Sequence, residues 1–190
     1  MNYKDEYISL FKTHIKREGA EKLLDYLTKS DFFVAPASSR YHSNHEGGLC
    51  EHCVKVFYRF MQNLDMEYAE ERETVIPDES VAIIALLHDI CKVDTYKTEF
   101  RNQKQDGVWV SVPYYTVDDR LPFGHGEKSV YMLSSFIRLT REEAMAINWH
   151  MGAFDFRVMG GSNALSQVFT LHPISLLFHI SDLQSTYLDE

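Results

Sequence analysis

The sequence predicts a mainly α-helical fold, a single-domain helical bundle that carries one small β-hairpin insertion. Through most of the 190 residues, apolar side chains recur at intervals of three and four, which is the spacing of amphipathic helices. Only around Asp106-Gly107 does the interval change to two, and this dipeptide is typical of a tight hairpin turn. No linker rich in proline, glycine or serine divides the chain, so we expect residues 1–190 to form one domain.

The first 30 residues are expected to form a helical scaffold. Their apolar periodicity predicts two helices, over 3–16 and 20–29, with Gly19 as the break between them. The N-terminal segment is charged throughout and lacks a long apolar run, so we expect no signal peptide, no membrane span and a cytoplasmic location. The 3 cysteines are too few for a disulfide framework, which agrees with a reducing compartment.

The formal net charge of −9 limits the partners that the sequence predicts. An acidic chain disfavours a broad basic surface for duplex nucleic acid, although it leaves room for a local basic pocket. Bound metal would offset part of this acidity. The sequence leaves the oligomeric state open.

The core that carries the expected metal site spans 36–190 and begins with an irregular loop. Gly47-Gly48 ends this loop, and a helix is expected over about 49–63. His52 lies on the apolar face of that helix, where a lone histidine is more often a packed core residue than a ligand. The loop also holds Arg40 and His42, and its glycines would allow a ligand to approach closely.

A second core helix, expected over about 79–91, ends in the adjacent residues His88 and Asp89. Burying an imidazole beside a carboxylate costs several kcal/mol unless something compensates for the lost hydration. A metal cation is the compensation that best fits these two groups. Lys92 follows, either as a cation that caps the helix or as a contact to a substrate phosphate.

The hairpin is predicted over about 96–117, directly after the His-Asp pair. Because an isolated hairpin is marginally stable in water, we expect it to pack on the helices. It would then form either a rim or lid over a pocket or a packing element in which Tyr114 and Tyr115 are core aromatics.

The helices after the hairpin carry further polar residues on inward faces. One helix begins at Gly124-His125-Gly126, where small residues permit the close approach of a metal or a phosphate. A capping box of Thr140 and Glu143 opens the next helix, which has His150 in its last turn. The last helix places Asp182 on its apolar stripe, and a buried carboxylate needs a partner.

These inward histidines and carboxylates are better explained by one shared cause than by separate accidents. Mixed imidazole and carboxylate ligands suit Mn, Fe, Co, Ni or Zn, and they also permit Mg. Because none of these inward polar residues is a cysteine, a structural zinc site is disfavoured. We therefore predict one or two divalent transition-metal ions as the cofactor. The expected metal ligands are His52, His88, Asp89, His125, His150 and Asp182.

The order of these residues resembles the HD-domain superfamily of metal-dependent phosphohydrolases. The resemblance runs from 36 to 182 through G-G-L-x-x-H at 47–52, L-L-H-D-I-x-K at 86–92, G-H-G at 124–126, the helix of His150, and H-I-S-D at 179–182. It implies an HD-type helical fold in which the first metal is held at positions matching His52, His88, Asp89 and Asp182. In dinuclear members, positions like His125 and His150 hold a second ion, and the aspartate like Asp89 bridges the two.

Two details refine this resemblance. The loop that contains Arg40-Tyr41-His42 is most similar to the HD modules of bacterial 3′-to-5′ exoribonucleases. Cys91 stands where many members of the superfamily have glycine, and its small side chain fits that position.

The function that these observations predict is hydrolysis of a phosphoester by metal-activated water. The expected substrate is a nucleotide or a short oligonucleotide end, with no membrane and no duplex nucleic acid as partner. Asp89 and Lys92 are the expected catalytic residues, and Lys92, Arg40 and His42 are expected to hold the phosphate. Lys92 is the best placed of the three to assist the leaving group.

Two alternatives remain open at this stage. The domain could be a nucleotide-binding sensor or regulator with little or no turnover. The C-x-x-C of Cys50 and Cys53 could be redox-active or bind zinc, although its helical setting favours two buried, unreactive thiols. For His14, His172 and His179 we expect surface, helix-start and packing roles, and His179 is the least certain because it precedes Asp182 by three residues.

Overall fold

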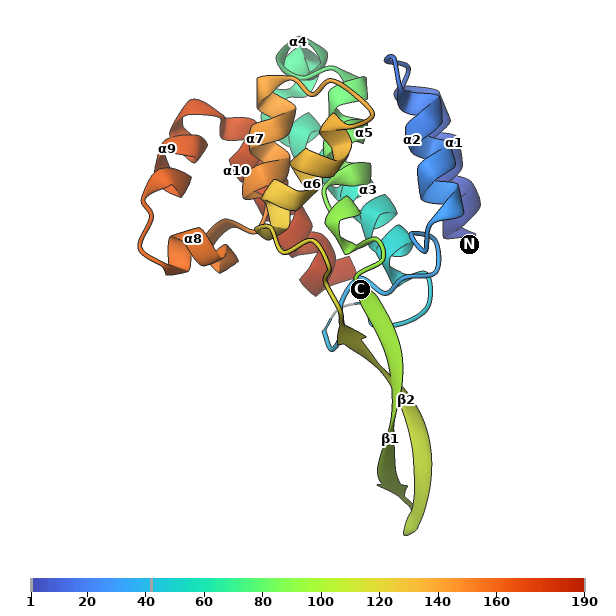
Figure 1. The fold of residues 1–190 in the computed structure, drawn as a ribbon. Helices are drawn as coiled ribbons and strands as arrows, with labels where there is room; N and C mark the ends of the chain where they lie inside the picture. Colours follow the sequence, from blue (N-terminus) through green and yellow to red (C-terminus); the bar gives the residue numbers. More distant parts are fainter. Residues whose placement is uncertain (1, 42, 190) are drawn as a thin grey trace.

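A largely apolar helix, α5 (Asp78–Leu87), lies at the centre of the helical body (Figure 1). The computed structural model describes residues 2–41 and 43–189. All α5 residues from Ser80 to Leu87 are buried, as expected for a helix that is apolar on every side. The chain is mainly helical, as predicted, and its strands form a two-stranded sheet.

The long helices pack around α5 and enclose one core. Helices α1 (Tyr3–His14), α3 (Gly48–Tyr68) and α7 (Arg141–Trp149) contact α5 directly. Helix α10 (Pro173–Gln184) lies against α3 and α7, and α2 (Ala20–Lys29) contributes its buried leucines to the same cluster. Tyr7 of α1 is fully buried and donates a 2.8 Å hydrogen bond to the carbonyl of Leu86, which ties the N-terminal scaffold to the centre.

Short elements connect these helices. The capping box of Thr140 and Glu143 and the first-turn position of Pro173 are confirmed. None of the described helices has the combination of length and apolar character that crossing a membrane requires. The connecting elements are η1 (Ala69–Glu71), α4 (Arg72–Val75), η2 (Ile90–Lys92), α6 (His125–Ser134), η3 (Gly152–Phe154), α8 (Phe156–Met159), α9 (Ala164–Leu171) and η4 (Ser185–Asp189).

The predicted hairpin is confirmed, but its predicted packing is wrong. Strands β1 (Tyr96–Gln105) and β2 (Val108–Val117) pair antiparallel, and both Asp106 (φ 48°) and Gly107 (φ 86°) adopt the positive φ that a tight turn requires. The hairpin projects away from the helices (Figure 1), and Trp109 near its tip is 69% exposed. It is stabilised by its own ladder of ten cross-strand residue pairs instead of by a helical surface.

Candidate metal centre

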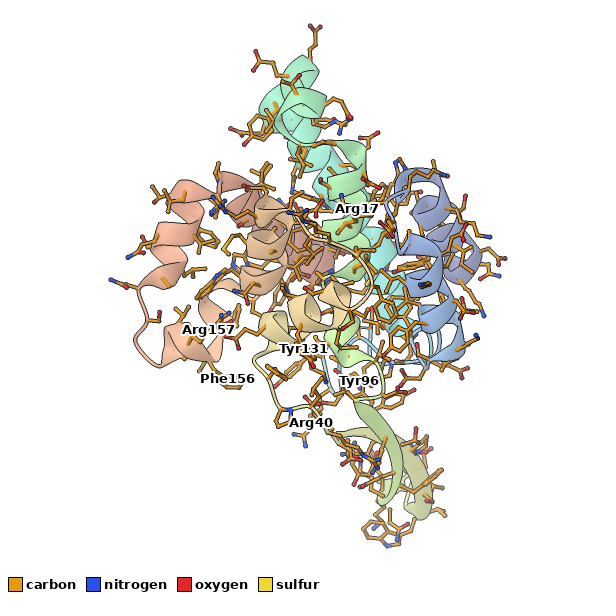
Figure 2. The ribbon with its side chains drawn as sticks, turned by 45° about the horizontal axis from the view of Figure 1, so that its top comes forward. Arg17, Arg40, Tyr96, Tyr131, Phe156 and Arg157 are labelled. Atoms are coloured by element: carbon orange, nitrogen blue, oxygen red, sulfur yellow. The ribbon has the colours of Figure 1, made fainter. Side chains whose placement is uncertain are left out.

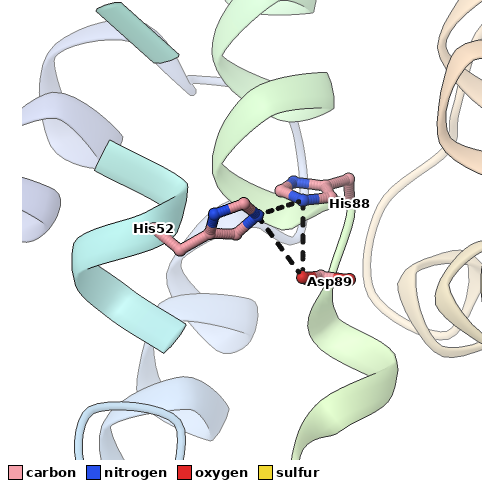
Figure 3. A group of neighbouring side chains, drawn as sticks. All are labelled: His52, His88 and Asp89. Atoms are coloured by element: carbon pink, nitrogen blue, oxygen red, sulfur yellow. Dashed lines mark hydrogen bonds and ion pairs between the residues drawn. The ribbon is translucent and has the colours of Figure 1, made fainter. Parts of the chain in front are cut away.

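The structure brings together the side chains of all six residues that were predicted as metal ligands. They come from five places in the fold: α3, the end of α5, the start of α6, the end of α7, and α10 (Figures 1 and 3). Each of three groups has one ligand atom per residue, with all atoms of the group within 4.8 Å of one another. The groups are His52, His88 and Asp89; His88, His150 and Asp182; and Asp89, His125 and His150.

Asp89 is shared between the two sides of this cluster. Its Oδ2 lies 3.5 Å from His88 Nε2 and 3.7 Å from His52 Nε2 (Figure 3). Its Oδ1 lies 2.7 Å from His125 Nε2 and 3.6 Å from His150 Nε2. The carboxylate therefore offers a separate oxygen to each pair of histidines, which is the arrangement a bridging ligand needs.

Two of the histidines are oriented by backbone carbonyls. His88 Nδ1 donates to the carbonyl of Ala85 at 2.9 Å, and His150 Nδ1 donates to the carbonyl of Ile147 at 2.7 Å. With these protons on Nδ1, the Nε2 atoms of both rings face the Asp89 carboxylate. Burial lowers the pKa of His88 to about 3, and the nearby carboxylates offset only part of this effect, so its ring is neutral.

This orientation brings ligand atoms together in a buried site. Nε2 of His88 and Oδ2 of Asp89 lie 3.5 Å apart, and each residue is at most 1% exposed. Lys92 Nζ lies 2.6 Å from the same Oδ2, and His52 Nε2 lies 3.3 Å from His88 Nε2. Imidazole nitrogens and carboxylate oxygens that converge in this way are the atoms that coordinate divalent transition metals, so the donor set fits a metal.

Asp182 closes one side of the cluster. Its Oδ1 lies 3.2 Å from Nε2 of His52, which is 1% exposed. Burial would raise the pKa of Asp182, but His52, His88 and His150 outweigh it and hold the pKa well below its ordinary value. The carboxylate is therefore ionised and able to act as a ligand.

Cys91 lies closer to the cluster than the sequence suggested. Its buried Sγ is 3.5 Å from both ring nitrogens of His125. Burial lowers the pKa of His125, but the neighbouring Cys91 and the hydrogen bond with Asp89 outweigh it and raise the pKa to about 10. A thiol therefore lies beside a predicted ligand, which only the spatial arrangement reveals.

Lys92 contacts Asp89 and also lines the cavity that opens onto the cluster. Its Nζ lies 2.6 Å from Asp89 Oδ2, and its side chain is only 11% exposed. Burial lowers the pKa of Lys92, but the adjacent carboxylate outweighs it and raises the pKa above its ordinary value. Lys92 is therefore a positive charge held beside the Asp89 carboxylate. The sequence offered two interpretations of it, a helix cap or a phosphate contact, and this position gives it more than a capping role.

The local backbone differs from the prediction at this point. We expected one helix as far as Cys91, but α5 ends at Leu87 and the tight turn η2 follows. Asp89 leaves the helical region of backbone conformation (φ −101°, ψ 17°), and its carbonyl accepts the amide of Lys92 at 3.0 Å. This break turns Asp89 so that its carboxylate faces histidines from α3, α6 and α7 together.

The predicted glycines allow backbones, not ligands, to approach. A Cβ on Gly48 would lie 2.0 Å from the carbonyl oxygen of Ser43, within the loop itself. A Cβ on Gly126 would lie 2.2 Å from the carbonyl oxygen of Asn148, so this glycine lets α6 pack tightly on α7. The close packing brings His125 and His150 together, with ring centroids 5.1 Å apart.

We expect Gly126→Ala to destabilise the fold by about 1–3 kcal/mol, because the added methyl group forces α6 away from α7 in a close-packed region. The same displacement would separate His125 from His150 and weaken metal binding at that side. Thermal unfolding with and without added Mn²⁺ measures both effects. Gly160→Ala is the matched control, since Gly160 is exposed and its added Cβ would lie 3.2 Å from the carbonyl oxygen of Phe156, against 2.2 Å for the closest contact at Gly126. Equal stability of the two variants would contradict this account.

A cavity of about 590 Å³ opens onto the cluster. Asp89, Lys92 and Asp182 form its polar end, and Tyr41, Phe154 and Tyr187 contribute aromatic side chains that are 58–83% exposed. His179 also lines it, and its Nδ1 donates a 2.6 Å hydrogen bond to the carbonyl of His150. The packing role expected for His179 is thus a supporting role at the candidate site, because it fixes the end of α7.

The residues predicted to hold a phosphate are not gathered in this cavity. Lys92 lines it, whereas Arg40 lines a different cavity beside the hairpin. His42 lies outside the described residues. Of the predicted phosphate ligands, Lys92 is therefore the one that the structure places beside the cluster of histidines and aspartates.

The C-x-x-C pair has the properties of buried thiols. Cys50 is 2% exposed and Cys53 is fully buried on α3. Burial raises the pKa of Cys50 to about 12 and that of Cys53 well above its ordinary value. Thiols with raised pKa values are poor nucleophiles and poor metal ligands, which supports the structural interpretation.

Comparison with known proteins adds no relative: no protein-family model, no curated protein and no solved structure matches the chain. The resemblance to the HD-domain superfamily therefore stays a prediction drawn from the motifs. The geometry itself gives a mainly helical protein with a buried cluster of histidines and aspartates that could hold a metal ion.

Proposed function

We propose that this chain is a metal-dependent phosphohydrolase of the HD type that cleaves a phosphoester of a nucleotide or a short oligonucleotide. The observation that carries the proposal is the Asp89 carboxylate, whose two oxygens face two different pairs of histidines beside an open cavity. His52, His88, Asp89 and Asp182 would hold one divalent ion, and His125 and His150, with Asp89 shared, would hold a second. The mixed donor set favours Mn, Fe, Co, Ni or Zn.

The chemistry follows from the position of the cluster at the end of the cavity. When bound, divalent metal supplies a water activated as a nucleophile and neutralises charge on a phosphoryl group. The protein residues then have to bind, orient and screen the substrate. Lys92 offers a charged donor where a phosphoryl oxygen or a leaving oxygen would lie, and the aromatic residues at the mouth offer flat apolar surfaces that suit a nucleobase.

The proposal is tested by metal content and turnover in the same preparation. Protein purified without added metal is analysed for transition metals, stripped with a chelator, and reloaded with Mn²⁺, Fe²⁺, Co²⁺, Ni²⁺ or Zn²⁺. We expect release of phosphate or mononucleotide from some member of a panel of nucleoside mono-, di- and triphosphates, dinucleotides and short oligonucleotides, and only with loaded protein.

Two outcomes would count against the enzyme. Loaded protein that turns over no member of the panel, yet binds one with micromolar affinity, would favour the nucleotide-binding sensor. Protein that binds no metal at all would reject both the hydrolase and the metal centre on which it depends.

A further inference from the structure

We propose that the cavity between the hairpin base and the loop residues 39–40 and 44–45 is an anion-binding subsite that holds a second phosphate of the substrate, remote from the phosphoester that is cleaved. The inference rests on the proposed function in so far as it assigns this phosphate to a substrate. It narrows the substrate class to molecules with at least two separated phosphates, such as a nucleoside bisphosphate or an oligonucleotide.

The cavity is lined by two arginines that come from separate parts of the chain. It has a volume of about 640 Å³ and receives Arg40 from the loop and Arg101 from β1. Figure 2 shows Arg40 and Tyr96 where the hairpin leaves the helices. Ser39, Asn44, His45 and Tyr114 add polar groups, so the lining offers many donors and no carboxylate.

The charges of these arginines are not compensated by ion pairs. Over residues 2–41 and 43–189, neither Arg40 nor Arg101 lies within 4.0 Å of a carboxylate oxygen, although the chain as a whole is acidic. Two acids lie next to the lining: Glu99 accepts the Tyr114 hydroxyl at 2.9 Å, and Glu51 lies 3.6 Å from His45 Nε2. Arg40 and Arg101 are exposed, and a phosphate between them would accept paired hydrogen bonds from their guanidinium groups.

The fold supports both sides of the hollow. The Arg101 guanidinium carbon lies 5.2 Å from the centre of the Tyr114 ring, which restricts its motion. On the loop side, the side-chain amide of Asn44 donates to the carbonyl of Ser39, and the backbone N–H of Tyr41 donates to Ser38 Oγ at 2.8 Å. The Tyr96 hydroxyl bonds to the carbonyl of Ala37 at 3.4 Å, which attaches the loop to the base of the hairpin.

The subsite adjoins the candidate metal centre along the chain. Arg40 lines the hairpin cavity, and the next residue, Tyr41, lines the cavity that opens onto Asp89 and Lys92. Consecutive Cα atoms are about 3.8 Å apart, so one short stretch of loop separates the two cavities. A substrate that crosses this stretch would place one phosphate at the metal cluster and another between the arginines, with Tyr41 beside the connecting nucleoside.

The first experiment measures binding without turnover. Chelator-stripped protein is titrated with a fluorescein-labelled thymidine tetranucleotide over a series of salt concentrations. We expect R40Q/R101Q to bind more weakly than wild type and to lower the slope of log Kd against log salt by about 0.7, the contribution of the one phosphate that the two arginines hold on a single strand. K104Q/R120Q removes the same charge from exposed positions near the hairpin tip and after β2, and it should leave the slope unchanged.

The second experiment asks whether the bound phosphate belongs to the substrate. Thymidine 5′-(p-nitrophenyl phosphate) is compared with the same ester carrying a 3′-phosphate, using Mn²⁺-loaded protein. The added phosphate should lower KM by about tenfold in wild type, as expected for one charge-assisted contact, and have little effect on kcat. In R40Q/R101Q the KM ratio of the two esters should fall to about one.

The outcomes separate this inference from the proposed function. Turnover with an equal KM ratio in wild type and R40Q/R101Q would overturn the subsite and leave the hydrolase intact. Absence of turnover would reject the hydrolase, and the binding experiment would then decide the subsite alone. Equal salt slopes for R40Q/R101Q and K104Q/R120Q would overturn it in that case.

Discussion

Replacing Asp89 by asparagine is expected to abolish metal binding at both sides of the cluster and, with it, turnover. Asparagine keeps the shape of the side chain but removes the negative charge that both histidine pairs face. Changes to groups that merely support metal ligands already cost about 10–100-fold in affinity, so loss of a shared ligand should cost more than about 100-fold. Elemental analysis and the Mn²⁺ dependence of thermal unfolding measure the effect on binding, and the substrate panel measures the effect on turnover.

Asp106→Asn is the matched control, because it makes the same chemical change in the exposed hairpin turn, where asparagine also tolerates a positive φ. Asp89→Asn leaves Lys92 buried without its partner, and the single variant could lose stability for that reason. D89N/K92M removes both charges and keeps the prediction testable if the single variant unfolds. A D89N protein that retains wild-type metal content would contradict the proposed centre.

Metal binding should also raise the free energy of unfolding, by an amount that grows with the logarithm of the metal concentration divided by Kd. A ligand that binds only the folded state stabilises it by about 2.7 kcal/mol at 100 times its Kd. The gain would come from coordination by the Asp89 oxygens and the histidine nitrogens that face them.

The fold was largely predictable because its signals are local. Apolar spacing located the helices, Asp106-Gly107 set the hairpin turn, and Thr140 with Glu143 marked the start of α7. The end of α5 was not predictable in this way, since a continuous apolar run gives no stop signal. The helix ends at Leu87, and the Asp89 carboxylate beyond it lies 2.7 Å from His125, a long-range contact that apolar spacing does not encode.

The packing of the hairpin was predicted wrongly for a related reason: the sequence signal is local, whereas packing depends on distant parts of the chain. Alternating residues such as Val108 and Val110 predict strands, but they do not say whether another layer covers either face. The ladder formed, and the face that includes Phe100 and Trp109 stayed exposed.

The candidate ligands could be predicted because each is a polar group on an apolar helix face, and such groups need partners. Their mutual distances, and the proximity of Cys91 to His125, required the fold. Arg40 shows the opposite limit: its charge type suggested a phosphate contact, but only the structure shows that it meets Arg101 in a separate cavity.

The second large effect is expected for Glu143→Ala, which should destabilise the fold by about 3–5 kcal/mol, the cost of breaking a buried ion pair by removing one partner. Glu143 is fully buried, and both of its oxygens are satisfied by the guanidinium of Arg17 at 2.8 Å. The same carboxylate accepts the Ser80 hydroxyl at 2.7 Å and the Thr140 amide at 2.8 Å. Urea unfolding followed by circular dichroism measures the change.

Glu73→Ala supplies the control, because Glu73 pairs with Arg72 at 3.2 Å but its side chain is 61% exposed, and exposed pairs contribute about 0–1 kcal/mol. If the loss in Glu143→Ala comes from the guanidinium of Arg17, which keeps Glu79 at 3.2 Å but loses its buried partner, the double variant R17M/E143L should recover much of it, since an apolar pair of similar size leaves no buried charge there. If the loss comes only from the capping box, the double variant should be as unstable as the single one. The first result would identify this ion pair as the contact that fixes α7 against the N-terminal scaffold and α5, and therefore as the support that holds His150 in reach of Asp89.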